Sequence, residues 1–329
     1  MEDHLLPGVK ELADDLFMIT LPMPFRLEHV NVYALIEGDG LSLFDTGGNF
    51  PGTFDILEQF LQRVGFSVTR VRRVFITHFH ADHCGIAGLI KEKSGASVLM
   101  SETDFGNIRS LGQEGTHLRL LRTFCLEQGL DNGTAEMVAG VFRSFKEMTL
   151  PFQADAYLKD GLEVTAGDKT VRVVATPGHT RGHCSFFIPE DGILVAGDNV
   201  LPHITPNLSI DLLSPEFRPL KSFIESLEKV SRLPVDTVYP AHGLPFQDLR
   251  GRVEEIKAHH RERKALMLRA LEGRPKTATG VSLVVFGNDL PEFDRLLALN
   301  ETYVHLLELE HEGVIRRCRQ GEEYVFTFV

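Results

Sequence analysis

Short runs of apolar and β-branched residues, separated by turn-forming residues, dominate the first hundred positions of the chain. Their length and composition are typical of strands, which we predict at 16–20, 30–36, 41–45, 71–77 and 96–100. A Glu-Gly-Asp-Gly turn at 37–40 favours a hairpin between the second and third of these strands. Apolar residues at helical spacing predict helices at 53–65 and 85–95.

Residues 101–155 lack this strand pattern and carry helical patterns, so we expect a helical insertion there. The strand pattern then resumes, and we predict strands within 161–179, 184–189 and 192–198. A helix at about 215–232 and a short strand before Tyr239 complete this part of the chain. Alternation of strands and helices on this scale indicates an α/β fold.

The pattern changes again near residue 250. A long amphipathic helix at 252–272, helical stretches near 279–287 and 295–313, and two terminal strands predict a small winged-helix-like unit. We therefore divide the chain into a main domain, 1–249, and a C-terminal domain, 250–329.

Composition narrows the class of protein. The 329 residues are 43% hydrophobic and 24% charged, as in ordinary globular proteins. No apolar run approaches the ~18 residues of a membrane-spanning helix, and the N-terminus lacks the charge order of a signal peptide. We expect a cytoplasmic protein with no membrane partner. The net charge of −12 opposes non-specific binding to nucleic acid.

Four polar side chains follow the predicted strand at 71–77: His78, His80, Asp82 and His83. Burying them without partners would be costly, so we interpret them as metal ligands. A catalytic zinc usually has three protein ligands and one open position. Four ligands in one motif therefore indicate that the set is divided between two metals and completed from elsewhere in the chain.

Three later strand ends supply further candidates: His179 in Thr-Pro-Gly-His, Asp198 in Ala-Gly-Asp and His242 in Pro-Ala-His-Gly. Loops at strand ends present functional side chains along one edge of a sheet. Histidine and aspartate suit several metals. We expect two divalent ions, with zinc as the first choice and iron or manganese as alternatives.

Together with Phe-Asp-Thr-Gly-Gly at 44–48, these motifs resemble those of the metallo-β-lactamase superfamily over roughly 15–250. The resemblance implies an αββα four-layer sandwich with the metals along one edge. The ligand sets that it implies are His78, His80 and His179 for the first metal, Asp82, His83 and His242 for the second, and Asp198 between them. It also implies that Asp45 supports a ligand histidine from behind.

Zinc β-lactamases of the main class carry cysteine where this chain has Asp198, so the chain resembles the hydrolase branch typified by glyoxalase II. His80 stands where the flavodiiron branch has a carboxylate. The insertion and the tail resemble those of the winged-helix-tailed proteins of the superfamily. That group includes a mitochondrial single-strand ribonuclease and bacterial hydrolases.

A water molecule held by two such metals would ionise at a pH of roughly 7 and attack as hydroxide, with Asp82 orienting it. His203, shortly after Asp198, is a candidate proton donor or substrate contact. His183 is expected either to support the ligands or to pack beneath them.

We expect a metal-dependent hydrolase of a small-molecule ester, thioester or lactone, with the insertion forming a wall or lid over the metal edge. The alternative is a metal-dependent ribonuclease or phosphodiesterase that acts on single-stranded RNA or DNA, because the stretch 252–276 has a basic surplus. An oxygenase-like activity, or a binding role with a homodimer formed through the tail, is also left open.

Overall fold

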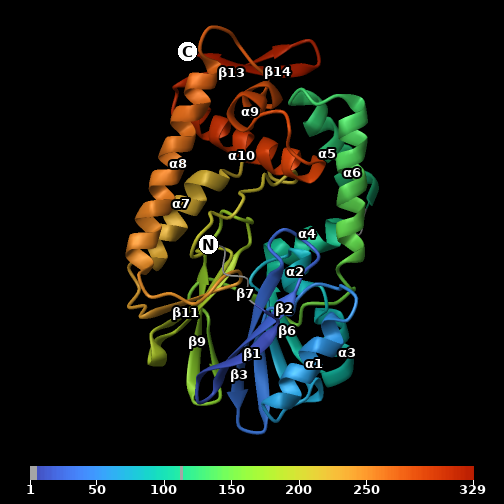
Figure 1. Ribbon diagram of the computed structural model, residues 1–329, viewed down its shortest axis with the longest axis vertical. Coiled ribbons are helices and arrows are strands. Elements are labelled where there is room, and N and C mark those ends of the chain that lie inside the picture. The colour runs from blue at the N-terminus through green and yellow to red at the C-terminus, as the bar shows by residue number, and fades with distance from the viewer. Residues whose placement is uncertain (1–5, 112–113) are drawn as a thin grey trace.

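The computed structural model describes residues 6–111 and 114–329. Two β-sheets face each other in the lower half of the molecule, and helices cover their outer surfaces (Figure 1). The first sheet contains, in spatial order, β1 (Gly8–Ala13), β2 (Leu16–Pro22), β3 (His29–Glu37), β4 (Gly40–Phe44), β5 (Val71–Phe75), β6 (Ser97–Ser101) and β7 (Ala156–Leu158). The second contains β12 (Thr237–Pro240), β11 (Ile193–Gly197), β10 (Cys184–Ile188), β9 (Lys169–Ala175) and β8 (Glu163–Ala166).

Alternate residues of each inner strand face opposite layers, which explains why apolar residues occur at both alternating sets of positions in these strands. In β3, Tyr33 and Leu35 pack between the sheets, whereas Val32 and Ala34 face the outer helices. The helices on the first sheet are α1 (Thr53–Arg63), α2 (Ala81–Cys84) and α3 (Ala87–Ser94). The second sheet is covered by α7 (Pro219–Val230) and α8 (Leu249–Leu271), which share a core with it. The α/β class and the four-layer sandwich are therefore confirmed.

Phenylalanine side chains fill the centre of the space between the sheets. Phe44 and Phe75 lie on neighbouring strands with ring centroids 5.2 Å apart, and Phe186 of the second sheet lies 5.3 and 5.5 Å from them. All three are fully buried. Each buried side chain of this size contributes roughly 1.5–3 kcal/mol, so this cluster fixes the two sheets face to face.

The insertion contains α4 (Glu102–Leu111), α5 (Glu114–Glu127) and α6 (Asn132–Glu147). The tail adds to α8 the elements α9 (Ala278–Phe286), α10 (Glu292–His311) and the hairpin β13 (Ile315–Gln320) and β14 (Glu323–Phe328). The predicted three helices and hairpin are present, and their assignment to the winged-helix class stays a prediction.

The apolar face of α5 packs on the tail. Leu121, Phe124 and Cys125 share one buried cluster with Leu306 and Phe326. Figure 1 shows α6 beside α5, running downward from the tail to the sandwich. The division at residue 249 stays a prediction, but this packing unites the insertion and the tail.

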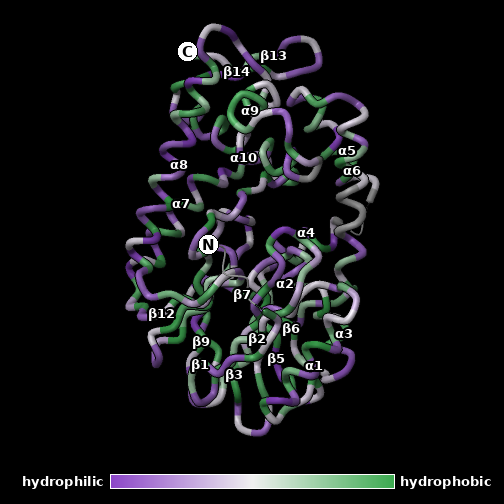
Figure 2. Tube along the Cα trace, in the orientation of Figure 1, coloured by the Kyte–Doolittle hydropathy of each residue, from purple (hydrophilic) through white to green (hydrophobic). Residues whose placement is uncertain are grey.

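The tail helices differ in hydropathy. Figure 2 shows α9 as hydrophobic and α8 as largely hydrophilic. Val281 of α9 is buried in the tail core, whereas Leu283 and Val284 remain 44% and 59% exposed. Among the described residues, no helix is both long and apolar enough to span a bilayer.

Candidate metal centre

The strands that precede the predicted ligands end at the same edge of the sandwich. β4 and β5 are parallel, as are β11 and β12, so their carboxyl ends lie together. Asp45, His78, Asp198 and His242 all come shortly after those ends. The next residues after His80 form the helical turn α2, in which the backbone N–H of His83 donates to the carbonyl of His80 (3.0 Å). This turn brings Asp82 and His83 back toward the edge.

The first group of candidate ligands, called the first ligand group below, consists of His78, His80 and His179. His78 Nε2 lies 3.0 Å from His80 Nδ1 and 3.2 Å from His179 Nε2, and the last two nitrogens are 2.9 Å apart. Nitrogens around a tetrahedral zinc, each about 2.0–2.1 Å from the metal, lie roughly 3.3 Å apart. The three rings therefore converge closely enough to hold one ion.

The outer nitrogens of these rings fix which nitrogen faces inward. His179 Nδ1 donates to the carbonyl of Asn207 (2.7 Å). His78 Nδ1 lies 2.9 Å from Thr77 Oγ1, whose hydroxyl donates to Asp45 Oδ2 (2.9 Å), so the imidazole is the donor to Thr77. The inner nitrogens of His78 and His179 consequently carry lone pairs that face each other, an arrangement that a cation stabilises.

The second group of candidate ligands, called the second ligand group below, consists of Asp82, His83 and His242. Asp82 Oδ2 lies 3.4 Å from His83 Nε2 and 3.5 Å from His242 Nε2. The outer nitrogen of His83 donates to Asp45 Oδ2 (2.8 Å), and that of His242 donates to the carbonyl of His29 (2.8 Å). In the neutral form of these rings, both inner nitrogens would carry lone pairs.

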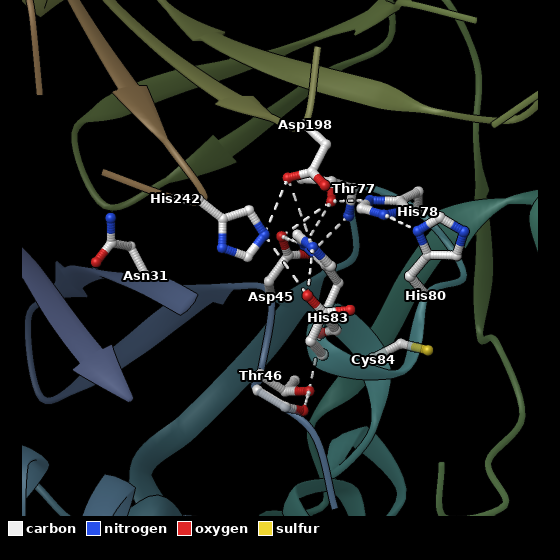
Figure 3. Close-up of polar contacts among 12 residues, drawn as sticks. Asn31, Asp45, Thr46, Thr77, His78, His80, His83, Cys84, Asp198 and His242 are labelled. Atoms are coloured by element: carbon white, nitrogen blue, oxygen red, sulfur yellow. Dashed lines mark hydrogen bonds and ion pairs between the residues drawn. The ribbon is translucent and has the colours of Figure 1, made fainter. Parts of the chain in front are cut away.

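Asp198 lies between the two groups, and Figure 3 shows it above His83, with His242 on one side and His78 on the other. Its Oδ2 is 3.4 Å from His179 Nε2, whereas its Oδ1 is 3.5 Å from His242 Nε2 and 3.6 Å from His83 Nε2. The two oxygens of one carboxylate thus face different ligand groups.

Unsatisfied polar atoms test whether these residues fit metal ions. His83 Nε2, His242 Nε2 and Asp198 Oδ1 are buried and have no hydrogen-bond partner. Buried polar atoms are normally paired, and these three are grouped around one position. Neutral imidazole nitrogens and a carboxylate oxygen are ligand atoms that suit a divalent cation. These residues therefore fit a metal ion.

Electrostatics also favour a cation here. Burial, followed by neighbouring histidines, lowers the pKa of His78, and burial lowers that of His80 to about 3. These rings are therefore neutral at pH 7 and free to coordinate. Burial opposes charge on His83, yet the carboxylates of Asp82, Asp198 and Asp45 raise its pKa well above its ordinary value. That shift reports an excess of negative charge that a metal ion would offset.

Asp45 adopts a backbone conformation that aspartate seldom uses. Its φ is 63°, in the left-handed region that is unfavourable for most non-glycine residues. The side chain is buried, and Oδ1 accepts from the backbone N–H of Thr77 (2.8 Å) while Oδ2 accepts from His83. The strained backbone is held by these contacts, which orient the ring of His83.

His183 is buried behind the ligands and holds the backbone of Asp198. Its Nδ1 lies 2.8 Å from Thr176 Oγ1, and its Nε2 accepts from the backbone N–H of Asp198 (3.1 Å). Gly197, with a φ of 54°, allows this approach because a Cβ at that position would crowd His183 Nε2. His203 is exposed on the following segment and does not lie in either ligand group.

Several supporting contacts could not be read from the sequence motifs. Asn207 and His29 each orient a ligand through a backbone carbonyl, which no residue type signals. Asp104 of α4 contacts the backbone beside two ligand histidines. As an acidic residue in the first turn of a helix, it resembles many residues that only favour the helix dipole.

A four-layer αββα sandwich with a histidine and aspartate cluster along one edge defines a class of metallo-hydrolase. The sequence profile of the metallo-beta-lactamase superfamily matches residues 26–242 of this chain. The chain belongs to that superfamily and is a metal-dependent hydrolase.

Two similar proteins match the chain over almost its whole length, and a third matches about three quarters of it. A probable metallo-hydrolase of Bacillus subtilis is 28% identical over 326 residues, covering 95% of this chain and 98% of the relative. A metallo-beta-lactamase family protein from Thermus thermophilus is 31% identical, with a TM-score of 0.86 and coverage of 97% of this chain and 100% of that one. An atrochrysone carboxyl ACP thioesterase of Cryptosporiopsis is 26% identical over 251 residues, covering 76% of this chain and 60% of the relative.

Proposed function

We propose that this chain is a binuclear hydrolase of esters, thioesters or lactones of small organic acids. The first ligand group would hold one divalent cation and the second ligand group another, with Asp198 binding both. The observation that carries this proposal is the orientation of the Asp198 carboxylate, whose two oxygens face different groups at 3.4 and 3.5 Å. Paired ions that share ligands in this way are typical of hydrolytic centres.

The bound cations would lower the pKa of a water molecule to roughly 7 and polarise a substrate carbonyl. The chain supplies a hydrogen-bond acceptor for that water in Asp82, whose side chain is 20% exposed and therefore accessible to solvent. Burial opposes ionisation of Asp82, but His83 and His242 beside it lower its pKa below the ordinary value. Asp82 is therefore ionised at neutral pH. Its carboxylate can orient an attacking water molecule by accepting a hydrogen bond from it.

His203 is proposed as a substrate contact or proton donor, because it is exposed on the segment that follows Asp198. The substitution His203→Gln should lower kcat/KM by roughly 10²-fold or more if the ring transfers a proton. A contact that only binds substrate should raise KM with kcat unchanged. Metal content, measured by elemental analysis, should stay at the wild-type value in either case.

An acyl substrate is favoured over RNA. One of the relatives is named as an ACP thioesterase. The basic surplus at 252–276 lent weight to the nuclease alternative, but several of its cations form ion pairs within the chain. Arg252 pairs with Glu255, Lys257 with Glu228 and Lys264 with Glu312. These pairs reduce the positive charge available to phosphates.

The test has two parts. Elemental analysis of purified protein should find two ions per chain and identify zinc, iron or manganese. A panel of p-nitrophenyl esters, acyl-CoA thioesters, lactones and fluorescent single-stranded RNA should show turnover of acyl compounds that Asp198→Ala abolishes. Cleavage of RNA without turnover of any acyl compound would overturn the proposed substrate class, and protein unable to bind a divalent ion would overturn the proposal as a whole.

A further inference from the structure

Asp104 is a buried carboxylate outside both ligand groups. It lies in the first turn of α4, the helix that follows directly after β6, and its exposed fraction is 0%. A buried carboxylate must be compensated by hydrogen bonds or charge. The donors that compensate Asp104 belong to the loops that carry the first ligand group.

Those donors come from both sheets. Asp104 Oδ2 accepts from the backbone N–H of Phe79 (3.2 Å), the residue between His78 and His80. The same oxygen accepts from Thr180 Oγ1 (2.7 Å), and Oδ1 accepts from the backbone N–H of Gly182 (2.8 Å). Thr180 directly follows His179, on the loop between β9 and β10.

The surroundings of this carboxylate are shaped to receive it. A Cβ built on Gly182 would overlap Asp104 Oδ1 and Ser101 Oγ, so only glycine permits the approach of this loop. Ser101 Oγ also accepts from the backbone N–H of Asp104 (3.2 Å), which fixes the start of the helix. Burial raises the pKa of Asp104 to about 6, and the three donors oppose the rise. The group is therefore mainly ionised at pH 7.

We propose that Asp104 is a positioning residue that sets the separation of His78 and His80 from His179, and so determines the affinity of the first ligand group for its metal. His78 and His80 follow a strand of the first sheet, whereas His179 lies on a loop of the second. The Asp104 carboxylate connects these loops without touching the ligand rings. This inference rests on the proposed function, because it assumes that the first ligand group binds an ion.

Asp104 thereby supplies for the first ligand group what Asp45 supplies for the second. Asp45 contacts the ring of His83 directly, whereas Asp104 acts on the backbone beside the ligands. The contribution of supporting groups to metal affinity is commonly roughly 10–100-fold. The effect of Asp104 should be confined to the first ligand group, since its donors adjoin His78, His80 and His179, whereas Asp82 and His83 lie beyond them in the turn α2.

The experiment measures metal binding by each ligand group separately. The substitution His242→Ala removes a ligand of the second group and leaves the first group intact. The substitution His80→Ala removes a ligand of the first group and leaves the second intact. Affinity for Co²⁺ is measured by chelator competition and by the visible absorption bands of bound cobalt, with and without Asp104→Asn. We expect Asp104→Asn to weaken binding roughly 10–100-fold in the His242→Ala background and to change the cobalt bands there, with affinity unchanged in the His80→Ala background.

Two further variants serve as controls. Asp155→Asn removes a carboxylate that accepts from the backbone N–H of Val98 and from Lys91, near the start of β6 and away from the ligand loops. It should leave both affinities at the wild-type value. Thr180→Val removes one donor to Asp104 with little change of volume, and should weaken the first ligand group in the same direction if Asp104→Asn fails to fold.

Equal affinity with and without Asp104→Asn in the His242→Ala background would overturn the proposal, as would equal losses in both backgrounds. Either result differs from failure of the proposed function. If the proposed function fails, the chain without substitutions does not bind two ions.

Discussion

At the scale of single residues, the centre depends on what lies behind each ligand. The lone pair that a histidine turns toward the metal position is fixed by the partner of its other nitrogen. For His83 that partner is the carboxylate of Asp45, a residue whose backbone φ is 63°. The strain at Asp45 is explained by this role, because the conformation aims one carboxylate at both the backbone of Thr77 and the ring of His83.

Two substitutions of Asp45 can distinguish the effect of its negative charge from the effect of its backbone conformation. Asparagine tolerates the left-handed region, so Asp45→Asn should fold, but its amide nitrogen cannot accept a hydrogen bond. We expect affinity for the second ion to fall roughly 10–100-fold. Asp45→Ala should lose as much affinity and also about 1 kcal/mol of stability from the unfavourable φ. Chelator competition and thermal melting measure the two effects. Asp39→Asn, an exposed aspartate that pairs with Arg72, is the control and should change neither.

The candidate ligands can be identified from the sequence, whereas the contacts that orient them cannot. The candidates are recognisable because metal binding requires particular side chains, here histidine and aspartate that follow strand ends. The carbonyl of Asn207 could belong to any residue type, and only the fold brings it to His179. Asp104 lies 24 residues beyond His80 in sequence, and its role appears only when α4 is placed against the loop after β9.

At the scale of elements, α8 and α10 meet through two buried histidines. His260 Nδ1 lies 3.0 Å from His305 Nε2, and His305 Nδ1 donates to the carbonyl of Glu301 (2.6 Å). Burial lowers the pKa of His305 to about 4 and also lowers the pKa of His260. Both rings are therefore neutral in the folded protein at pH values where the unfolded chain already binds protons.

This pair predicts loss of stability in acid. Because the folded pKa values lie below the unfolded value of about 6.5, the unfolded chain binds more protons as pH falls from 6.5 toward 4. The free energy of unfolding should therefore decrease over that window, by up to about 1.4 kcal/mol per pH unit for each histidine. The double substitution His260→Leu and His305→Leu should flatten this dependence relative to the natural sequence. Urea unfolding at several pH values measures the slope.

Elements with a strong periodic pattern were predicted close to their observed bounds, and weaker elements were missed. The strand predicted at 184–189 is β10, and the helix predicted at 252–272 is α8. β1 and β7 were not predicted, because β1 is nowhere fully buried and β7 has only three residues. The partner of the apolar face of α5 could not be predicted either, since helical periodicity reveals a buried face but not what covers it.

At the scale of the whole molecule, the tail is connected to the metal centre. Asn207, whose carbonyl orients His179, donates its side-chain amide to the carbonyl of Leu297 in α10 (3.0 Å). Arg218 on the same connecting segment forms two hydrogen bonds with Glu308 of α10 (2.6 and 3.2 Å). The helix α10 thus braces the segment that holds a ligand of the first group.

This connection predicts how the chain responds to loss of residues 250–329. Truncation there would remove the partners of Phe124 in the insertion and of Phe223 and Leu227 in α7, all of which are buried. Exposing an apolar surface of that kind favours aggregation, and the brace on Asn207 would be lost as well. We expect the fragment 1–249 to be insoluble or to bind the first ion weakly, and the full chain to melt in one transition. A soluble fragment with wild-type affinity for both ions would instead favour two independent domains.

The substitution Leu306→Ala distinguishes the same alternatives in the full-length chain. Leu306 is buried in the tail core, so its truncation should lower the free energy of unfolding by about 2–5 kcal/mol. If the tail and the sandwich unfold together, it lowers the melting temperature at which cobalt is released; if they are independent, cobalt release is unchanged.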